Sequence, residues 1–150
     1  MARAEASYGA LNGAKLEYSS TQSGSYTQIH GLKTIPEIGG TPNYLDTTDL
    51  DNTEYETSII GLMPAQNYDF EFNLELPQLT VEANIKVAND LENSGNEYYF
   101  KLTYASGIVI SFKSTVRISF AGGSTGDLEA FTMHLSPIGE PTRTLPSASL

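Results

Sequence analysis

Residues Asn67 to Leu76 read Asn-Tyr-Asp-Phe-Glu-Phe-Asn-Leu-Glu-Leu, which alternates strictly between polar and apolar side chains. Successive side chains of a β-strand point to opposite faces of the sheet, so this stretch has one apolar face and one polar face. Pro77 ends the stretch, because proline cannot donate to a sheet ladder. The pattern predicts a half-buried strand whose polar face carries acidic side chains.

Similar alternation occurs on both sides of this stretch. The predicted order is two strands, a long acidic loop, two strands of which this stretch is the clearest, one helix and then three strands, with clusters of Gly, Ser, Thr and Pro as breaks. A turn at Ser106-Gly107 separates the first two of the later strands. The predicted flanking strands lie at Leu16–Tyr18, Tyr26–Leu32, Tyr98–Tyr104, Ile108–Phe120 and Phe131–Leu135.

One helix is predicted between the central strand and the last three. Thr80 can cap its start, Glu82 suits its positive end, and Gly95 can close it. Apolar residues recur there at helical spacing, which predicts packing on the sheet. That stripe consists of Val81, Ile85, Val87, Ala88 and Leu91.

A run of strands with a single helix favours a mainly β, α+β fold. Strands with one polar face are typical of antiparallel pairing. We therefore expect one domain over residues 1–150, an antiparallel β-sandwich or partial barrel flanked by one α-helix. The patternless ends, residues 1–13 and 137–150, are interpreted as terminal arms that become ordered on assembly.

Residues 36–56 interrupt the alternation with Pro, Gly and a run of acids, and contain no Lys or Arg. A structureless loop of about 20 residues in a compact domain is either functional or disordered. Apolar residues among the acids need a surface to pack on, which another subunit can supply. The residues assigned to this inter-subunit loop are Ile38, Tyr44, Leu45, Asp46, Asp49, Leu50, Asp51, Glu54 and Tyr55.

The overall composition excludes several classes of protein. The chain of 150 residues has 18 acidic and 8 basic residues, a net charge of −10, which argues against wrapping phosphate backbones. Cysteine is absent, so disulfides and thiolate chemistry are excluded. We see no signal peptide and no apolar run near the roughly 20 residues of a membrane helix.

The motifs that resemble catalytic or metal sites have simpler interpretations. Gly122–Gly126 matches G-x-S-x-G around Ser124, but a strand follows where that motif needs a helix, so a hairpin loop is expected. His30 and His134 are far apart and too few for a metal site. Asp49–Glu54 resembles a calcium loop only weakly, since Glu54 replaces the required Gly. We expect no enzyme activity, no metal and no cofactor.

Three segments together resemble the major tail (tail tube) proteins of long-tailed bacteriophages. They are Ile29-His-Gly-Leu-Lys-Thr-Ile-Pro-Glu-Ile-Gly-Gly-Thr-Pro42, Tyr44-Leu-Asp-Thr-Thr-Asp-Leu50 and Ile59-Ile-Gly-Leu62. The likeness continues through Tyr99-Phe-Lys-Leu-Thr-Tyr104 and Ser136-Pro-Ile-Gly-Glu-Pro141, and covers residues 14–142. The Leu-x-x-Ile-Pro-Glu-Ile-Gly-Gly-x-Pro part is the most specific.

The resemblance implies a structural subunit of a virion tail, assembled in the host cytoplasm as stacked, hexameric rings. DNA would pass through an acidic or polar lumen without specific binding, and the tape measure and tail terminator would be partners. The long loop would reach a neighbouring ring. On the predicted strand, Asp69, Glu71 and Glu75 are the candidate lumen residues. Lys101, Lys113 and Arg117 suit an outer or inter-subunit face.

Two alternatives remain. Type VI secretion tube proteins share this fold, so a tube subunit of another injection machine is the first. A monomeric binding module, such as an Ig-like or carbohydrate-binding sandwich, is the second, and Tyr44, Tyr55 and Tyr99 motivate it.

Overall fold

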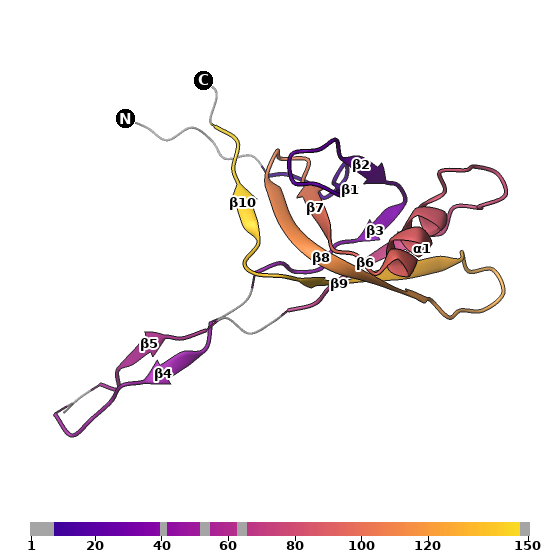
Figure 1. The fold of residues 1–150 in the computed structure, drawn as a ribbon. Helices are drawn as coiled ribbons and strands as arrows, with labels where there is room; N and C mark the ends of the chain where they lie inside the picture. The colour runs from indigo at the N-terminus through magenta and orange to yellow at the C-terminus, as the bar shows by residue number, and fades with distance from the viewer. Residues whose placement is uncertain (1–7, 40–41, 52–54, 63–65, 148–150) are drawn as a thin grey trace.

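The computed structural model describes residues 8–39, 42–51, 55–62 and 66–147. A curled sheet forms the body, one helix lies against it, and a two-stranded hairpin extends away from it (Figure 1). The elements are β1 (Lys15–Ser19), β2 (Thr27–Ile29), β3 (Leu32–Thr34), β4 (Tyr44–Asp46), β5 (Ser58–Ile60), β6 (Tyr68–Asn73), α1 (Asn84–Ser94), β7 (Tyr98–Thr103), β8 (Val109–Phe120), β9 (Ala130–Pro137) and β10 (Thr142–Thr144).

The body is an eight-stranded sheet in the order β2-β1-β7-β8-β9-β6-β3, with β10 beside β8. Every strand pair in it is antiparallel. The two edge strands, β2 and β3, are separated in sequence only by His30 and Gly31, so the sheet must curl until its edges approach. The expected mainly antiparallel β fold with a single helix is confirmed. The single strand expected from Tyr26 to Leu32 is instead two strands, one at each edge.

The inner face of the curled sheet holds the core. Aromatic rings of neighbouring strands pack directly: Phe72 and Phe131 stack with centroids 5.2 Å apart, and Tyr68 meets Phe112 edge-on at 5.3 Å. Burying each such side chain contributes about 1.5–3 kcal/mol. The alternation in the sequence identified this face correctly. The largest fully buried apolar side chains are Phe70, Phe72, Phe100, Phe131, Leu16, Ile29, Leu102, Met133 and Leu135.

The helix begins later than its sequence pattern predicts. Thr80 Oγ1 accepts a hydrogen bond from the amide of Glu82, within a turn that precedes the helix. Val81 is 79% exposed rather than packed on the sheet. The remaining apolar side chains do face the core, Val87 partly and the others fully. Gly95 closes the helix at φ 66°, in the left-handed region that favours glycine. That end of the helix is confirmed.

A buried Asn84 fixes the start of α1 against the sheet. Its Nδ2 donates to the carbonyls of His30 and Asn73, each at 2.7 Å, and its Oδ1 accepts the amide of Glu75 at 3.0 Å. Gly31 lies against it at φ 84°, where an added Cβ would come within 2.6 Å of that Nδ2. The junction between the sheet edges and the helix start is therefore a single hydrogen-bonded unit.

Two further boundaries differ from the prediction. β6 ends at Asn73, so Leu76, expected on the apolar face, is 46% exposed. The C-terminal segment was expected to be a patternless arm, but β10 pairs with β8 through Thr142 and Ser111. The sequence did not predict this strand, because it is only three residues long and lies between prolines. Residues 8–13 contain no strand or helix. No helix in the described ranges is long and apolar enough to cross a membrane.

Candidate assembly surfaces

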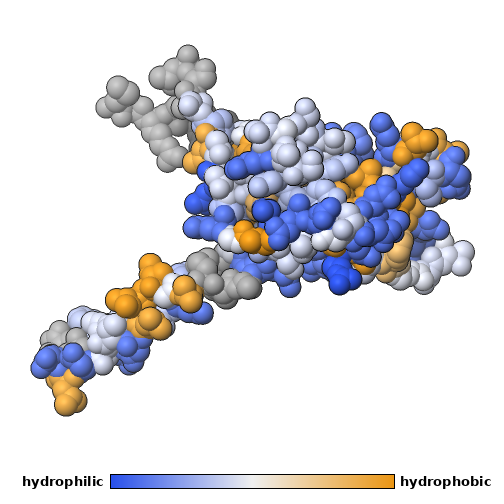
Figure 2. Space-filling model, viewed as in Figure 1, coloured by the Kyte–Doolittle hydropathy of each residue, from blue (hydrophilic) through white to orange (hydrophobic). Residues whose placement is uncertain are grey.

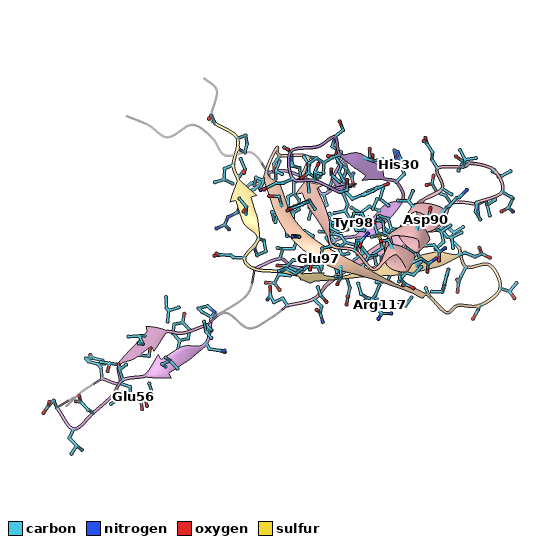
Figure 3. All side chains as sticks on the ribbon, in the orientation of Figure 1. His30, Glu56, Asp90, Glu97, Tyr98 and Arg117 are labelled. Atoms are coloured by element: carbon cyan, nitrogen blue, oxygen red, sulfur yellow. The ribbon has the colours of Figure 1, made fainter. Side chains whose placement is uncertain are left out.

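The predicted long loop proves to be a hairpin. Within residues 36–56 the chain forms β4, which pairs with β5 as a separate sheet, Leu45 lying opposite Ile59. The hydroxyls of Thr47 and Thr57 are 2.9 Å apart and tie the strands together beyond the ladder. Figure 3 shows side chains crowding the body, whereas those of the hairpin, Glu56 among them, stand away from it.

Short polar contacts shape the tip of the hairpin. Asp46 Oδ1 accepts the amide of Thr48 at 2.9 Å, and Asp49 Oδ1 accepts the amide of Asp51 at 2.9 Å. Such contacts stabilise turns. The bond from the Thr48 amide also holds the pKa of the Asp46 carboxyl below its usual range. Leu50, between two aspartates, is fully exposed.

Large apolar side chains on the hairpin face solvent. An isolated two-stranded hairpin is only marginally stable in water. Contiguous exposed apolar surface on a soluble protein marks an interaction site. The orange side chains of the projecting hairpin are visible in Figure 2. The exposed large apolar side chains of the hairpin and its flanks are Tyr44, Leu45, Leu50, Tyr55, Ile59, Ile60 and Leu62.

The structure separates the predicted loop residues into groups. Ile38 is half-buried and packs against the core, apart from the hairpin. Glu54 lies outside the described residues, and the remaining predicted residues lie on the hairpin. Sequence reasoning did not assign Ile59, Ile60 and Leu62 to this loop, and their pattern gives no signal of exposure, because a short apolar run is typical of a buried strand.

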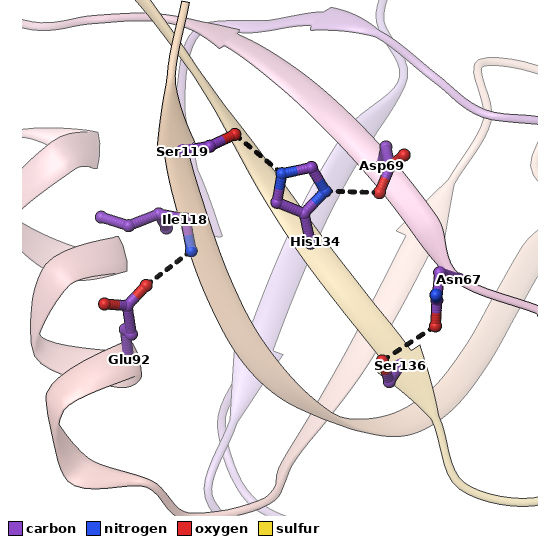
Figure 4. Close-up of polar contacts among 7 residues, drawn as sticks. All are labelled: Asn67, Asp69, Glu92, Ile118, Ser119, His134 and Ser136. Atoms are coloured by element: carbon purple, nitrogen blue, oxygen red, sulfur yellow. Dashed lines mark hydrogen bonds and ion pairs between the residues drawn. The ribbon is translucent and has the colours of Figure 1, made fainter.

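The polar face of β8, β9 and β6 carries a hydrogen-bonded row (Figure 4). His134 Nδ1 lies 2.6 Å from Asp69 Oδ1, and His134 Nε2 lies 2.7 Å from Ser119 Oγ. Arg117 pairs with His134 in register and therefore shares its face. A parallel contact joins Ser136 Oγ to Asn67 Oδ1 at 2.9 Å. These contacts bind three strands together on the outside of the sheet.

The other two predicted lumen acids also have partners within the subunit. Glu71 lies 3.5 Å from the ammonium of Lys33 and accepts from Thr34 at 3.4 Å. Glu75 lies beyond β6, and its Oε1 accepts the backbone amide of Asn84 at 3.0 Å. Glu75 is thus at the helix start, apart from the two acids on the strand.

The bases predicted to occupy a different face share the outer side of the same sheet. Arg117 lies beside the acids of β6, through its pairing with His134. Lys101 and Lys113 lie on β7 and the first half of β8. Acids accompany them as well, because Glu17 lies opposite Lys101 in register and Glu97 lies 3.1 Å from Lys113, so the outer face mixes acidic and basic side chains.

Lys101 and Lys113 line a cleft of about 340 Å³. Its floor is β7 and β8, and its walls come from the link between β1 and β2 and from the segment before β10. Lys101 lies 4.2 Å from the ring centroid of Tyr26, and Lys113 lies 3.1 Å from Glu97. The hydrogen bond to Glu97 raises the pKa of Lys113. Ile138 adds an apolar wall.

The Asp69–His134–Ser119 row has the connectivity of a hydrolytic triad. Hydrolysis also needs oxyanion donors and a place for the reacting carbonyl beside the nucleophile. Ser119 projects from a continuous strand on an open sheet face rather than from a strained turn. Cross-strand stabilisation accounts for the row without catalysis.

The remaining motifs also lie in structural settings. The Gly122–Gly126 segment lies in the hairpin loop between β8 and β9, as predicted, and the Ser124 amide donates to Asp127 at 2.8 Å. His30 lies between strands rather than within one. Among the described residues, no group of three or more His, Asp or Glu side chains could hold a metal ion.

Comparison with known proteins relates the whole fold to two assemblies. No family model matches the chain, and no curated protein matches it in sequence. A chain from the tail of an empty GTA particle, refined with C6 symmetry, matches with a TM-score of 0.66 and 18% identity, over 90% of this chain and 99% of that one. A chain from the six-fold symmetrised baseplate of the anti-feeding prophage matches with a TM-score of 0.60 and 9% identity, over 97% and 98%.

At these identities the comparisons show the fold. The chain is therefore a mostly antiparallel β protein with one helix, whose fold occurs in the tail of one particle and the baseplate of another. Both solved assemblies have six-fold symmetry.

Proposed function

We propose that the protein is a structural tube subunit of a phage-like tail, assembled as stacked hexameric rings. The observation that carries the proposal is the exposed apolar hairpin, because a monomer gains nothing from projecting such a surface into water. The shared fold supports the same function, since both matched assemblies are six-fold symmetric particle components. A heterologous contact repeated around a ring closes it, and one repeated along an axis builds a tube.

The polar outer face of β6 and β9 is the proposed wall of the lumen. Asp69 and Glu71 lie there, and acidic or neutral linings repel phosphate and allow DNA to slide. Their partners hold both carboxylates in place on the sheet rather than in mobile loops. Glu75 lies beyond β6 and accepts the amide of Asn84 at the helix start, so the proposed wall rests on Asp69 and Glu71.

The proposed cargo is DNA, and the proposed location is the tail of a virion or phage-like particle. The tape measure and tail terminator are the expected partners. The same architecture also suits the tube of another injection machine, which would carry a different cargo. Purifying particles and testing their contents for nuclease-sensitive nucleic acid separates these two possibilities.

Electron microscopy of the purified protein tests the structural function directly. We expect rings or tubes at high concentration or beside other tail components, and a native ring mass six times that of the 16.2 kDa chain. Persistent monomers under all these conditions would refute the proposal. A monomer that bound a glycan saturably would support the binding-module alternative instead.

A further inference from the structure

We infer that the cleft between β7, β8 and the segment before β10 receives Leu50 of a second copy, with the flanking aspartates of that copy facing Lys101 and Lys113. This inference rests on the proposed function and deepens it, because it assigns the acceptor surface for the hairpin. The observations that carry it are the shape of the cleft, its charge and the composition of the hairpin tip.

The cleft has room for one aliphatic side chain. Its volume is about 340 Å³, and a cavity of about 150 Å³ already holds a benzene molecule. Tyr26, Tyr99 and Ile138 supply apolar surface around it. Leu50 is the only fully exposed large apolar side chain among the described residues, and its turn presents it between two carboxylates.

Charge favours this cleft over the other exposed apolar surface. The described tip residues Asp49 and Asp51 are acidic, and Lys101 and Lys113 line the cleft together with Glu140. Glu17 lies opposite Lys101 in register and Glu97 pairs with Lys113, so the cleft is the site with bases among its acids rather than a purely basic one. Lys101 contacts an aromatic ring, and its cross-strand neighbour Glu17 forms its ion pair with Lys15, so among the described residues no carboxylate lies within ion-pair distance of Lys101. It can therefore accept an acidic partner from another chain.

The competing exposed apolar side chains lie on two loops at the end of the body away from the hairpin, the β8–β9 loop and the segment before α1. They include Leu79, Val81 and Leu128. The amide of Leu74 donates to the carbonyl of Glu129, which brings these two segments together. The acids around them, Glu82, Asp127 and Glu129, would repel an acidic hairpin tip.

The tip of the same chain does not occupy the cleft. In Figure 1 the hairpin leaves the body and its tip is the most distant part of the molecule from β7 and β8. A second copy is therefore the occupant that carries both the apolar side chain and the complementary charge. The contact is heterologous, as stacking requires.

Disulfide trapping tests the contact, because the natural sequence contains no cysteine. The double variant L50C/I138C should give a ladder of covalent oligomers when assembled protein is oxidised. The matched control L50C/L128C pairs the tip with the competing surface and should give no ladder. A ladder from the control, or none from L50C/I138C in tubes visible by microscopy, would overturn the inference.

Charge exchange gives an independent readout. Lys101→Glu should reduce tube growth at least about tenfold, because like charges would then face one another. Adding Asp51→Lys to it should restore growth, whereas Lys86→Glu, a charge reversal on an exposed helix position, should leave growth unchanged. Failure of wild-type protein to form tubes would refute the proposed function. Normal growth of Lys101→Glu would refute only the assignment of the cleft.

Discussion

Asn84 joins the helix, the end of β6 and the edge junction through one buried amide. Its side chain makes three hydrogen bonds to backbone groups, and those groups are otherwise enclosed by the fold. Removing one partner of a buried hydrogen bond leaves the other desolvated, which costs more than the bond contributes when formed. The side chain is thus more important for stability than its polar character suggests.

Asn84→Ala is expected to lower the free energy of unfolding by about 2–3 kcal/mol, because it leaves two carbonyls and an amide unsatisfied. Chemical denaturation monitored by circular dichroism measures the change. The control is Asn89→Ala on the exposed side of the same helix, which should stay within about 0.5 kcal/mol of wild type. Equal effects of the two substitutions would contradict the role assigned to the amide.

Tyr68 is expected to make the fold sensitive to alkali. Burial raises the pKa of its hydroxyl above the ordinary value of 10.0, so the folded state retains the proton more strongly than the unfolded state. Stability from this group is therefore complete below pH 10 and is lost as pH rises through the folded-state pKa. Tyr68→Phe removes the titrating group and keeps the ring packed on Phe112.

The check is the melting temperature of both proteins between pH 8 and pH 11. Wild type should lose more stability above pH 10 than Tyr68→Phe does. Identical curves would show that the hydroxyl has the same pKa in the folded and the unfolded state.

At the scale of elements, the β4–β5 hairpin is separable from the body. The strand pairing of β4 and β5 lies within the hairpin, and the apolar side chains of the hairpin are exposed rather than part of the core. Removing residues 40–54 alone would leave β5 without its partner, so the informative change replaces residues 43–62 with a short Gly-Ser linker. The melting temperature should change little, and tube growth should be abolished.

Point variants sharpen that prediction. Leu50→Ser and Leu128→Ser each replace an exposed leucine, one at the hairpin tip and one on the opposite end of the body. Microscopy should show impaired tubes for the first variant only. Normal tubes from the hairpin replacement would show that assembly uses other surfaces.

The elements also show which parts of the fold the sequence could predict. Alternation identified β6, β7, β8 and β9, because each buries one face of several successive residues. The break at Gly31 was missed, although Ile29 and Leu32 are three residues apart and would lie on opposite faces of one continuous strand. The helix start was misplaced because Thr80 satisfies the local capping pattern, whereas the contacts of Asn84 depend on residues distant in sequence.

The sequence predicted several of the residues that form the exposed hairpin surface but not that they form a hairpin. Acids mixed with apolar residues indicated an interaction surface, and the structure places most of them on the hairpin. The pairing of Leu45 with Ile59 was not predictable, because neither strand alternates. The pairing of Lys113 with Glu97 was not predictable either, because a strand pattern does not specify which side chain of the preceding segment reaches it.

The whole molecule offers a test of which side of the sheet lines the bore. Glu71 on β6 and Glu17 on β1 each form one ion pair with a lysine, at 3.5 and 3.9 Å. Glu71→Lys and Glu17→Lys therefore change the same charge and lose a comparable contact. Asp69 is less suitable for reversal, because its carboxylate also holds His134.

Cation selectivity of the ionic conductance through single assembled tubes provides the measurement. Glu71→Lys should lower it, because a ring of reversed charges would line the bore, whereas Glu17→Lys should leave it near the wild-type value. The converse result would move the lumen to the β1 side. If neither substitution changed the cation selectivity, both residues would be excluded from the lining.

The order of strands in the sheet also sets the order of events during synthesis. β1 pairs with β7, and Lys15 is opposite Thr103, so the first strand waits for most of the chain to emerge before its inner partner exists. The β4–β5 hairpin closes locally and can form long before the body does. Pairings between strands so distant in sequence slow folding, and the partly folded intermediates expose apolar surface and unpaired strand edges. The β4–β5 hairpin is thus synthesised before β7 and β8, which form the proposed acceptor cleft. A nascent chain cannot be incorporated into a tube until its last strands have been translated.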